Sequence, residues 1–91
     1  MNIPQITNID TAIKIYYSYT EIGTKEMTQL FTRHSKSTIN RLKKIAQKRM
    51  IQENVYSYGM YKVNTDCAYK SWGIDIQDLE KRRNKLQKLG L

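Results

Sequence analysis

The stretch SKSTINRLKKIAQKRM, residues 35–50, combines a helical spacing of apolar residues with a concentration of positive charge. Its apolar side chains recur every three or four residues, as they do along one face of an α-helix. The segment therefore predicts an amphipathic helix that buries one face and leaves a polar, cationic face exposed. The apolar set is Ile39, Leu42, Ile45 and Ala46, and the opposite set is Ser37, Asn40, Arg41, Lys44 and Lys48.

Most of the net charge of the chain lies around this helix. The 91 residues carry 16 Lys and Arg against 8 Asp and Glu, for a net charge of +8. Residues 24–50 hold eight of the basic side chains and one acid, Glu26, so this window has a net charge of +7. Charge gathered in one segment favours a surface for a polyanion over a general aid to solubility. A lysine-rich surface without a partner is the alternative.

Length and composition exclude several classes of function. A chain of 91 residues makes one small domain, which is too small for a deep enzymatic cleft. The single cysteine, Cys67, cannot form an intramolecular disulfide, and one histidine cannot build a metal cluster. The acids show no metal-loop spacing, and no phosphate-binding glycine loop is present. We expect no enzymatic activity, no metal and no cofactor.

The chain also lacks the patterns of secretion and membrane insertion. Its first residues, MNIPQITNID, do not combine a basic end with an apolar run, as a signal peptide does. No apolar stretch approaches the roughly 20 residues that a membrane-spanning helix needs. We therefore expect a cytoplasmic protein.

Two further helices are predicted before residue 35. The first covers TAIKIYYSYT, residues 11–20, with Asn8 or Asp10 as its cap. The second covers KEMTQLF, residues 25–31, with Thr24 as its cap, and the turn TRHS then leads to the third helix, capped by Ser35 or Ser37. The apolar stripe of the first helix is predicted to contain Ile9, Ile13, Tyr16, Tyr17 and Thr20.

The helical period fades after Met50. Residues 51–64, IQENVYSYGMYKVN, favour a short β-hairpin that reverses at Gly59. A short helix capped by Asn64 or Thr65 should end at Gly73, and Asp75 should open a last helix that reaches about residue 89. The predicted fold class is mainly α with a small β-hairpin.

This order of elements, together with STINRLKKIAQKRMIQEN at residues 37–54, resembles the winged helix-turn-helix regulators of the MarR type. Those proteins commonly read S-T-V-x-R-L and then K-R-G-L-V. The resemblance covers residues 24–63, and it departs at Met50, where the family often has Gly, and at the turn TRHS, where it has a compact G-V-S. It implies a winged helix-turn-helix domain over residues 1–73 and an added C-terminal helix over residues 74–91. The matching residues are Ser37, Thr38, Ile39, Arg41, Leu42, Lys48, Arg49 and Ile51.

The resemblance implies binding of double-stranded DNA, with the recognition helix, residues 35–49, in the major groove. The residue chemistry agrees, because Asn can pair with adenine and Arg with guanine, while Lys contacts phosphates. Asn40 and Arg41 are therefore the candidates for sequence readout. Lys62 lies in the expected hairpin, and two roles are equally open for it: a contact with the DNA backbone, or packing within the protein. The predicted DNA-binding set is Arg33, Lys36, Ser37, Thr38, Asn40, Arg41, Lys44, Lys48 and Lys62.

The last helix carries an apolar seam of Ile76, Leu79, Leu86 and Leu89. The resemblance implies a homodimer on a pseudo-palindromic site, and this seam could pair the two copies, with Tyr69 and Trp72 at the joint. The alternative is that the seam packs against the first helix of the same chain.

The function predicted from the sequence is a small, dimeric transcriptional regulator that binds a specific DNA site. The alternative is a plasmid or phage partition or replication adaptor, which binds repeated sites and recruits a partner protein. A third hypothesis is a winged helix that contacts only protein and binds no duplex. The Lys, Ile and Asn content is compatible with a mobile genetic element.

Overall fold

The computed structural model describes residues 6–57, 59 and 61–90. Within these residues the chain forms five helices and one two-stranded antiparallel sheet, which confirms a mainly helical fold with a small β component. The elements are, in order, α1 (Ile9–Ser18), β1 (Glu21–Ile22), α2 (Thr24–Leu30), α3 (Lys36–Gln52), β2 (Val63–Asn64), α4 (Thr65–Ser71) and α5 (Ile76–Lys88).

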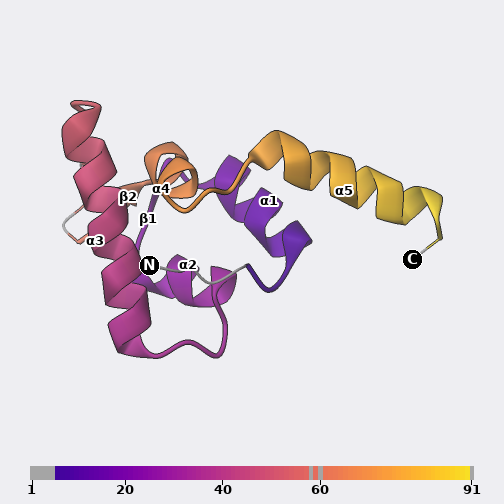
Figure 1. The fold of residues 1–91 in the computed structure, drawn as a ribbon, viewed down its shortest axis with the longest axis horizontal. Coiled ribbons are helices and arrows are strands. Elements are labelled where there is room, and N and C mark those ends of the chain that lie inside the picture. The colour runs from indigo at the N-terminus through magenta and orange to yellow at the C-terminus, as the bar shows by residue number, and fades with distance from the viewer. Residues whose placement is uncertain (1–5, 58, 60, 91) are drawn as a thin grey trace.

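The helices are spread along an elongated body of 41 × 26 × 22 Å. Helix α3 stands at one end of the long axis, and the C-terminal half of α5 projects at the other end (Figure 1). Helices α1, α2 and α4 lie between them. Helix α3 packs mainly on α4, β2 and α2, whereas α5 packs on α1. The outer side of α3 therefore faces away from α5.

The core lies between α3 and the group formed by α1, α2 and α4. Its largest members are aromatic, and the rings of Phe31 and Trp72 meet edge to face with their centroids 5.3 Å apart. The hydroxyl of Tyr69 donates to the carbonyl oxygen of Ala12 at 2.6 Å, which joins α4 to α1 inside the core. Buried apolar residues from α1, α2, α3 and β2 fill the remaining space: Ile13, Ile15, Met27, Leu30, Ile39, Leu42, Ala46 and Val63.

Polar caps begin most of the helices, as their sequence predicts. At four helix starts a side chain accepts a backbone N–H of the first turn. Helix α2 differs, because its cap is Gly23 and not Thr24. The N–H of Gly23 donates to Oε1 of Glu26 at 2.9 Å, so Glu26 satisfies the start of this helix. The four side-chain caps are Asn8, Ser35, Asn64 and Asp75.

Helix α3 runs to Gln52, past the position where the resembled family has its glycine. The residue that turns the chain is Asn54, which adopts a left-handed conformation with φ of 56°. The N–H of Asn54 donates to Ile51, and that of Val55 donates to Met50. These two bonds are the pattern of a Schellman motif, in which Asn can replace Gly.

The hairpin predicted over residues 51–64 is wrong in its pairing. Residues 51 and 52 belong to α3, residues 53–57 are not a strand, and β2 pairs with β1 instead, with Ile22 opposite Val63. Of the predicted tip, Tyr58 and Met60 lie outside the described residues. Among the described residues of this segment, Tyr61 is left-handed, with φ of 65°, whereas Gly59 is not. The N–H of Gly59 donates to Oε1 of Glu21, which attaches the loop to β1.

The apolar stripe of α1 also differs from its prediction. Ala12, Ile13 and Ile15 are buried, while Tyr17 is 65% exposed. The hydroxyl of Tyr17 donates to Oε1 of Glu80 in α5. This bond to a carboxylate raises the pKa of Tyr17. Tyr17 thus joins the two helices at their edge and does not enter the core.

The first half of α5 belongs to the core of the chain. Leu79 is buried against α1, and Ile76 is half-buried. Tyr69 and Trp72 are buried in the same chain, so they do not lie at a joint between copies. Within the described residues, no helix has both the length and the apolar character needed to cross a bilayer.

Candidate nucleic-acid interface

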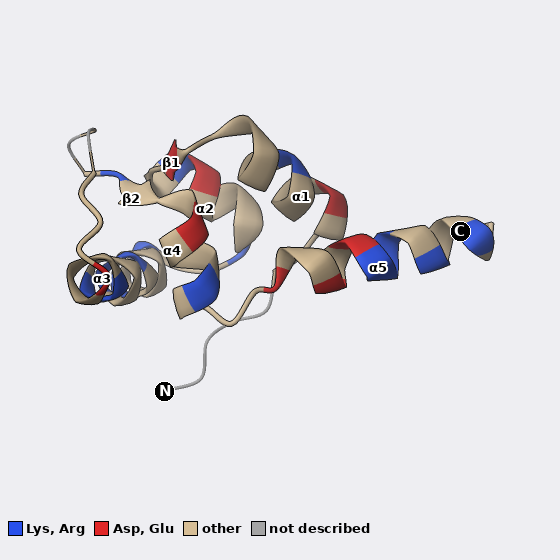
Figure 2. Ribbon diagram, turned by 90° about the horizontal axis from the view of Figure 1, so that it is seen from above, with Lys and Arg blue, Asp and Glu red and all other residues tan. Residues whose placement is uncertain are grey.

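The outward face of α3 is polar and basic from Lys36 to Lys48. Its apolar face is buried, with Ile39, Leu42 and Ala46 each at most 2% exposed. Helix α3 contains no Asp or Glu. Figure 2 shows Lys and Arg along α3, with acidic residues on α1, α2, α4 and the start of α5. The sequence prediction of the two faces is confirmed, except that Ile45 is only half-buried. The exposed set is Lys36, Ser37, Asn40, Arg41, Lys44 and Lys48.

Two residues extend this face and escaped the sequence reasoning. Gln47 is exposed, and it follows Lys44 by three residues, so it projects on the same side of the helix. Ile51, one turn further, is 76% exposed. The spacing from Lys44 could have identified both residues. We call the eight side chains the α3 face: Lys36, Ser37, Asn40, Arg41, Lys44, Gln47, Lys48 and Ile51.

The start of α3 lies next to an exposed turn. The N–H of Thr38 donates to Oγ of Ser35 at 3.3 Å, and the two hydroxyl oxygens lie 3.2 Å apart. Thr38 is half-buried, so it supports the cap of the helix. Arg33 is exposed in the preceding turn and has φ of 72°, a left-handed conformation that residues other than glycine rarely adopt. Positive charge thus continues from the helix into the turn.

Two other cations of α3 are engaged within the chain. Nε of Arg49 lies 2.6 Å from Oε2 of Glu53, and this bond lowers the pKa of the Glu53 carboxyl. Nζ of Lys43 lies 5.7 Å from the centre of the Tyr61 ring, a cation–π geometry that connects α3 to the following loop. These two side chains contribute to the packing of the chain.

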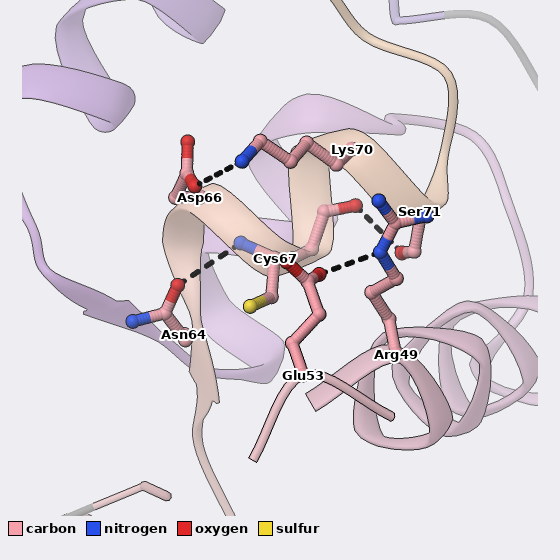
Figure 3. A network of polar contacts seen from close by, with 8 residues as sticks. Arg49, Glu53, Asn64, Asp66, Cys67, Lys70 and Ser71 are labelled. Carbon is pink, nitrogen blue, oxygen red and sulfur yellow. Dashed lines mark hydrogen bonds and ion pairs between the residues drawn. The ribbon is translucent and has the colours of Figure 1, made fainter. Parts of the chain in front are cut away.

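Polar contacts line α4 next to the end of α3, where Arg49 and Glu53 pair (Figure 3). Nζ of Lys70 lies 3.0 Å from Oδ2 of Asp66, and the hydroxyl of Tyr16 donates to Oδ1 of Asp66 at 2.9 Å. The Lys70 ammonium and the Tyr16 hydroxyl hold the pKa of Asp66 below its usual value. Cys67 lies beside these contacts, and its burial raises the pKa of its thiol. A raised pKa favours the protonated thiol, which is a poorer nucleophile than the thiolate.

The remaining predicted site residues lie elsewhere. Lys62 is exposed, and a Cβ placed on Gly59 would lie 2.8 Å from its Cδ, so its hydrocarbon stem packs over that glycine. The C-terminal seam is divided. Leu79 is 6% exposed, whereas Leu86 and Leu89 are 42% and 64% exposed. Only the second half of the seam is therefore available to a partner.

No metal centre is built by the part of the chain that the structure describes, where no three His, Cys, Asp or Glu side chains come together. The α3 face instead offers hydrogen-bond donors, acceptors and four cations on one convex helix surface. Such a surface suits a polyanion that also presents hydrogen-bonding groups, as the base edges of a nucleic acid do. Comparison with models of known protein families, with curated proteins and with solved structures found no match.

Proposed function

We propose that this chain binds double-stranded DNA by placing the α3 face in the major groove. The observation that carries the proposal is the exposure of this whole face, with its four cations and no acid, on a helix whose other side is buried. The B-DNA major groove, about 12 Å wide, admits one α-helix. Helix α5 packs on α1, so the tail leaves the α3 face uncovered among the described residues.

The positions along α3 suggest a division of roles. Recognition helices usually present their N-terminal residues to base edges. Asn40 and Arg41 lie in that half, and Asn pairs well with adenine and Arg with guanine. Lys44 and Lys48 follow on the same side, where a Lys ammonium can contact a phosphate. Different residues of one helix would then recognise the bases and contact the phosphates.

The topology supports a winged helix-turn-helix arrangement. Helices α2 and α3 form the two-helix unit, joined by the exposed turn at Arg33. Strand β1 precedes α2 and pairs with β2, and the segment between α3 and β2 would then take the place of the wing. In this arrangement the chain acts as a transcriptional regulator, and two copies occupy a pseudo-palindromic site.

The decisive experiment is selection of bound duplexes from a random pool with the full chain. Enrichment of one short motif is the expected result, and two inverted half-sites would indicate two copies. Recovery of random sequence, with no salt-sensitive duplex binding, would reject the proposal. Lys44→Ala and Lys48→Ala should weaken binding, and Lys14→Ala is the matched control, since Lys14 is an exposed lysine of α1.

Footprinting of the selected site separates the regulator from the partition or replication adaptor. A single protected palindrome supports the regulator. A long array of repeats with cooperative spreading supports the adaptor, and it would leave DNA binding by the α3 face intact.

A further inference from the structure

The C-terminal half of α5 presents exposed leucines beyond the core. Leu86 and Leu89 are 42% and 64% exposed, and this part of the helix projects away from the body of the chain (Figure 1). Isolated helices of this length are marginal in water. The last turns of α5 therefore expose two leucines among basic side chains, and they have little support from the rest of the described chain.

A groove lies directly beside these leucines. It has a volume of about 420 Å³, and it runs between the start of α1 and the second half of α5. The bond from Tyr17 to Glu80 joins the other ends of the same two helices, so α1 and α5 run antiparallel. The lining residues are Thr7, Asn8, Ile9, Asp10, Arg83, Leu86 and Gln87.

We infer that this patch is the interface between two copies of the chain, with Leu89 of each copy seated in the groove of the other. A two-fold interface uses the same surface twice, so a projection beside a matching hollow makes a surface complementary to itself. Leu89 is the projection, and the groove that starts at Leu86 is the hollow. The second half of the apolar seam thus forms the interface together with the start of α1.

Charge complementarity favours a second copy as the occupant. Asp10, the one acid among the described residues of the groove, is exposed on the wall formed by α1, while Arg83 lies on the wall formed by α5, and Lys85 and Lys88 are exposed on the helix that carries Leu89. When Leu89 of one copy enters the groove of the other, the two lysines come to the side of Asp10. The two-fold axis repeats this opposite-charge contact, so each interface contains it twice.

The first test is sedimentation of the full chain without nucleic acid. The native chain should form a concentration-dependent dimer. Leu86→Gln with Leu89→Gln should raise the dimer dissociation constant by about tenfold or more, because both substitutions remove apolar area that the interface would bury. Ile51→Gln is the matched control, since Ile51 is also an exposed aliphatic residue near a helix end, and this variant should dimerise as the native chain does.

The second test exchanges the charges. Asp10→Lys should weaken dimerisation, and so should Lys85→Glu with Lys88→Glu, because each variant places like charges on both sides of the contact. An equimolar mixture of the two variants should recover the dimer, since every contact in the mixed pair again joins opposite charges. Far-UV circular dichroism of each variant verifies that the helices are retained.

A native chain that stays monomeric at every concentration would overturn the inference. So would leucine variants that dimerise normally, or mixed charge variants that stay monomeric. A complex in which only DNA or an unrelated protein covers the leucines would also replace the second copy as the occupant. These readouts need no DNA, so the inference can fail while the proposed function stands, and the reverse also holds.

Discussion

The indole Nε1 of Trp72 donates a hydrogen bond to the backbone carbonyl of Leu42 at 2.9 Å. Both residues are buried, Trp72 at the end of α4 and Leu42 in the middle of α3. Leu42 lies on the side of α3 opposite Asn40 and Lys44. The contact therefore helps to hold the rotation of α3 that turns its polar face outward.

Replacing Trp72 with Phe removes this hydrogen bond and part of the edge-to-face contact with Phe31. We expect a loss of about 1 to 3 kcal/mol in the free energy of unfolding, measured by urea denaturation. Tyr56→Phe is the control, because Tyr56 is exposed, and it should change the free energy by less than about 0.5 kcal/mol. Equal stability of the Trp72 variant and the native chain would contradict a structural role of the bond.

A second prediction concerns stability at the ends of α3 and α4, because each helix has a left-handed residue after its last turn. Gly73 has φ of 73°, and a Cβ added to it would meet nothing within 4 Å, so only backbone strain opposes a larger residue. Gly73→Ala should therefore cost about 1 kcal/mol of unfolding free energy. Asn54→Gly should be neutral or stabilising, because Gly adopts this conformation without strain. A destabilised Asn54→Gly variant would indicate that the Asn side chain has a role beyond the turn.

Substitutions at Asn40 and at Lys48 should affect DNA affinity in different ways. Asn40→Ala should cost about 1 to 3 kcal/mol on the selected site and relax the preference at one base pair, with little effect on random DNA. Lys48→Ala should weaken all duplexes similarly and reduce the salt slope by about one. Fluorescence anisotropy over a salt series measures both effects. Identical behaviour of the two variants would refute the division between reading and anchoring.

The contacts of Asp66 predict that the stability of the folded chain depends on pH. The pKa of Asp66 is lower in the folded chain than the ordinary value of about 3.9, because the Lys70 ammonium and the Tyr16 hydroxyl favour the carboxylate. Its stabilising effect is therefore complete above that value and is lost as the pH falls through the lower, folded pKa. The urea midpoint of the native chain should exceed that of Asp66→Asn at pH 7, and the difference should shrink below about pH 4. A difference that stays constant would exclude this linkage.

The local features of the chain can be predicted well from the sequence. The two faces of α3 follow from a repeat of three and four residues, and the caps Asn8, Ser35, Asn64 and Asp75 follow from side chains that accept the first amides of a helix. The exposed candidates Asn40, Arg41, Lys44 and Lys48 follow from the same repeat. Such signals depend only on neighbours within one helical turn, so they can be identified from the sequence alone.

The pairing of distant segments was decided only by the tertiary structure. Strand β1 is two residues long and has no detectable period, and Val63 pairs with Ile22 across the whole of α2 and α3. The seam of α5 reads as one stripe, yet α1 is short enough to cover Leu79 and leave Leu89 exposed. Periodicity reports which side of a helix is apolar, whereas the length and position of its neighbour decide how much of that side is buried.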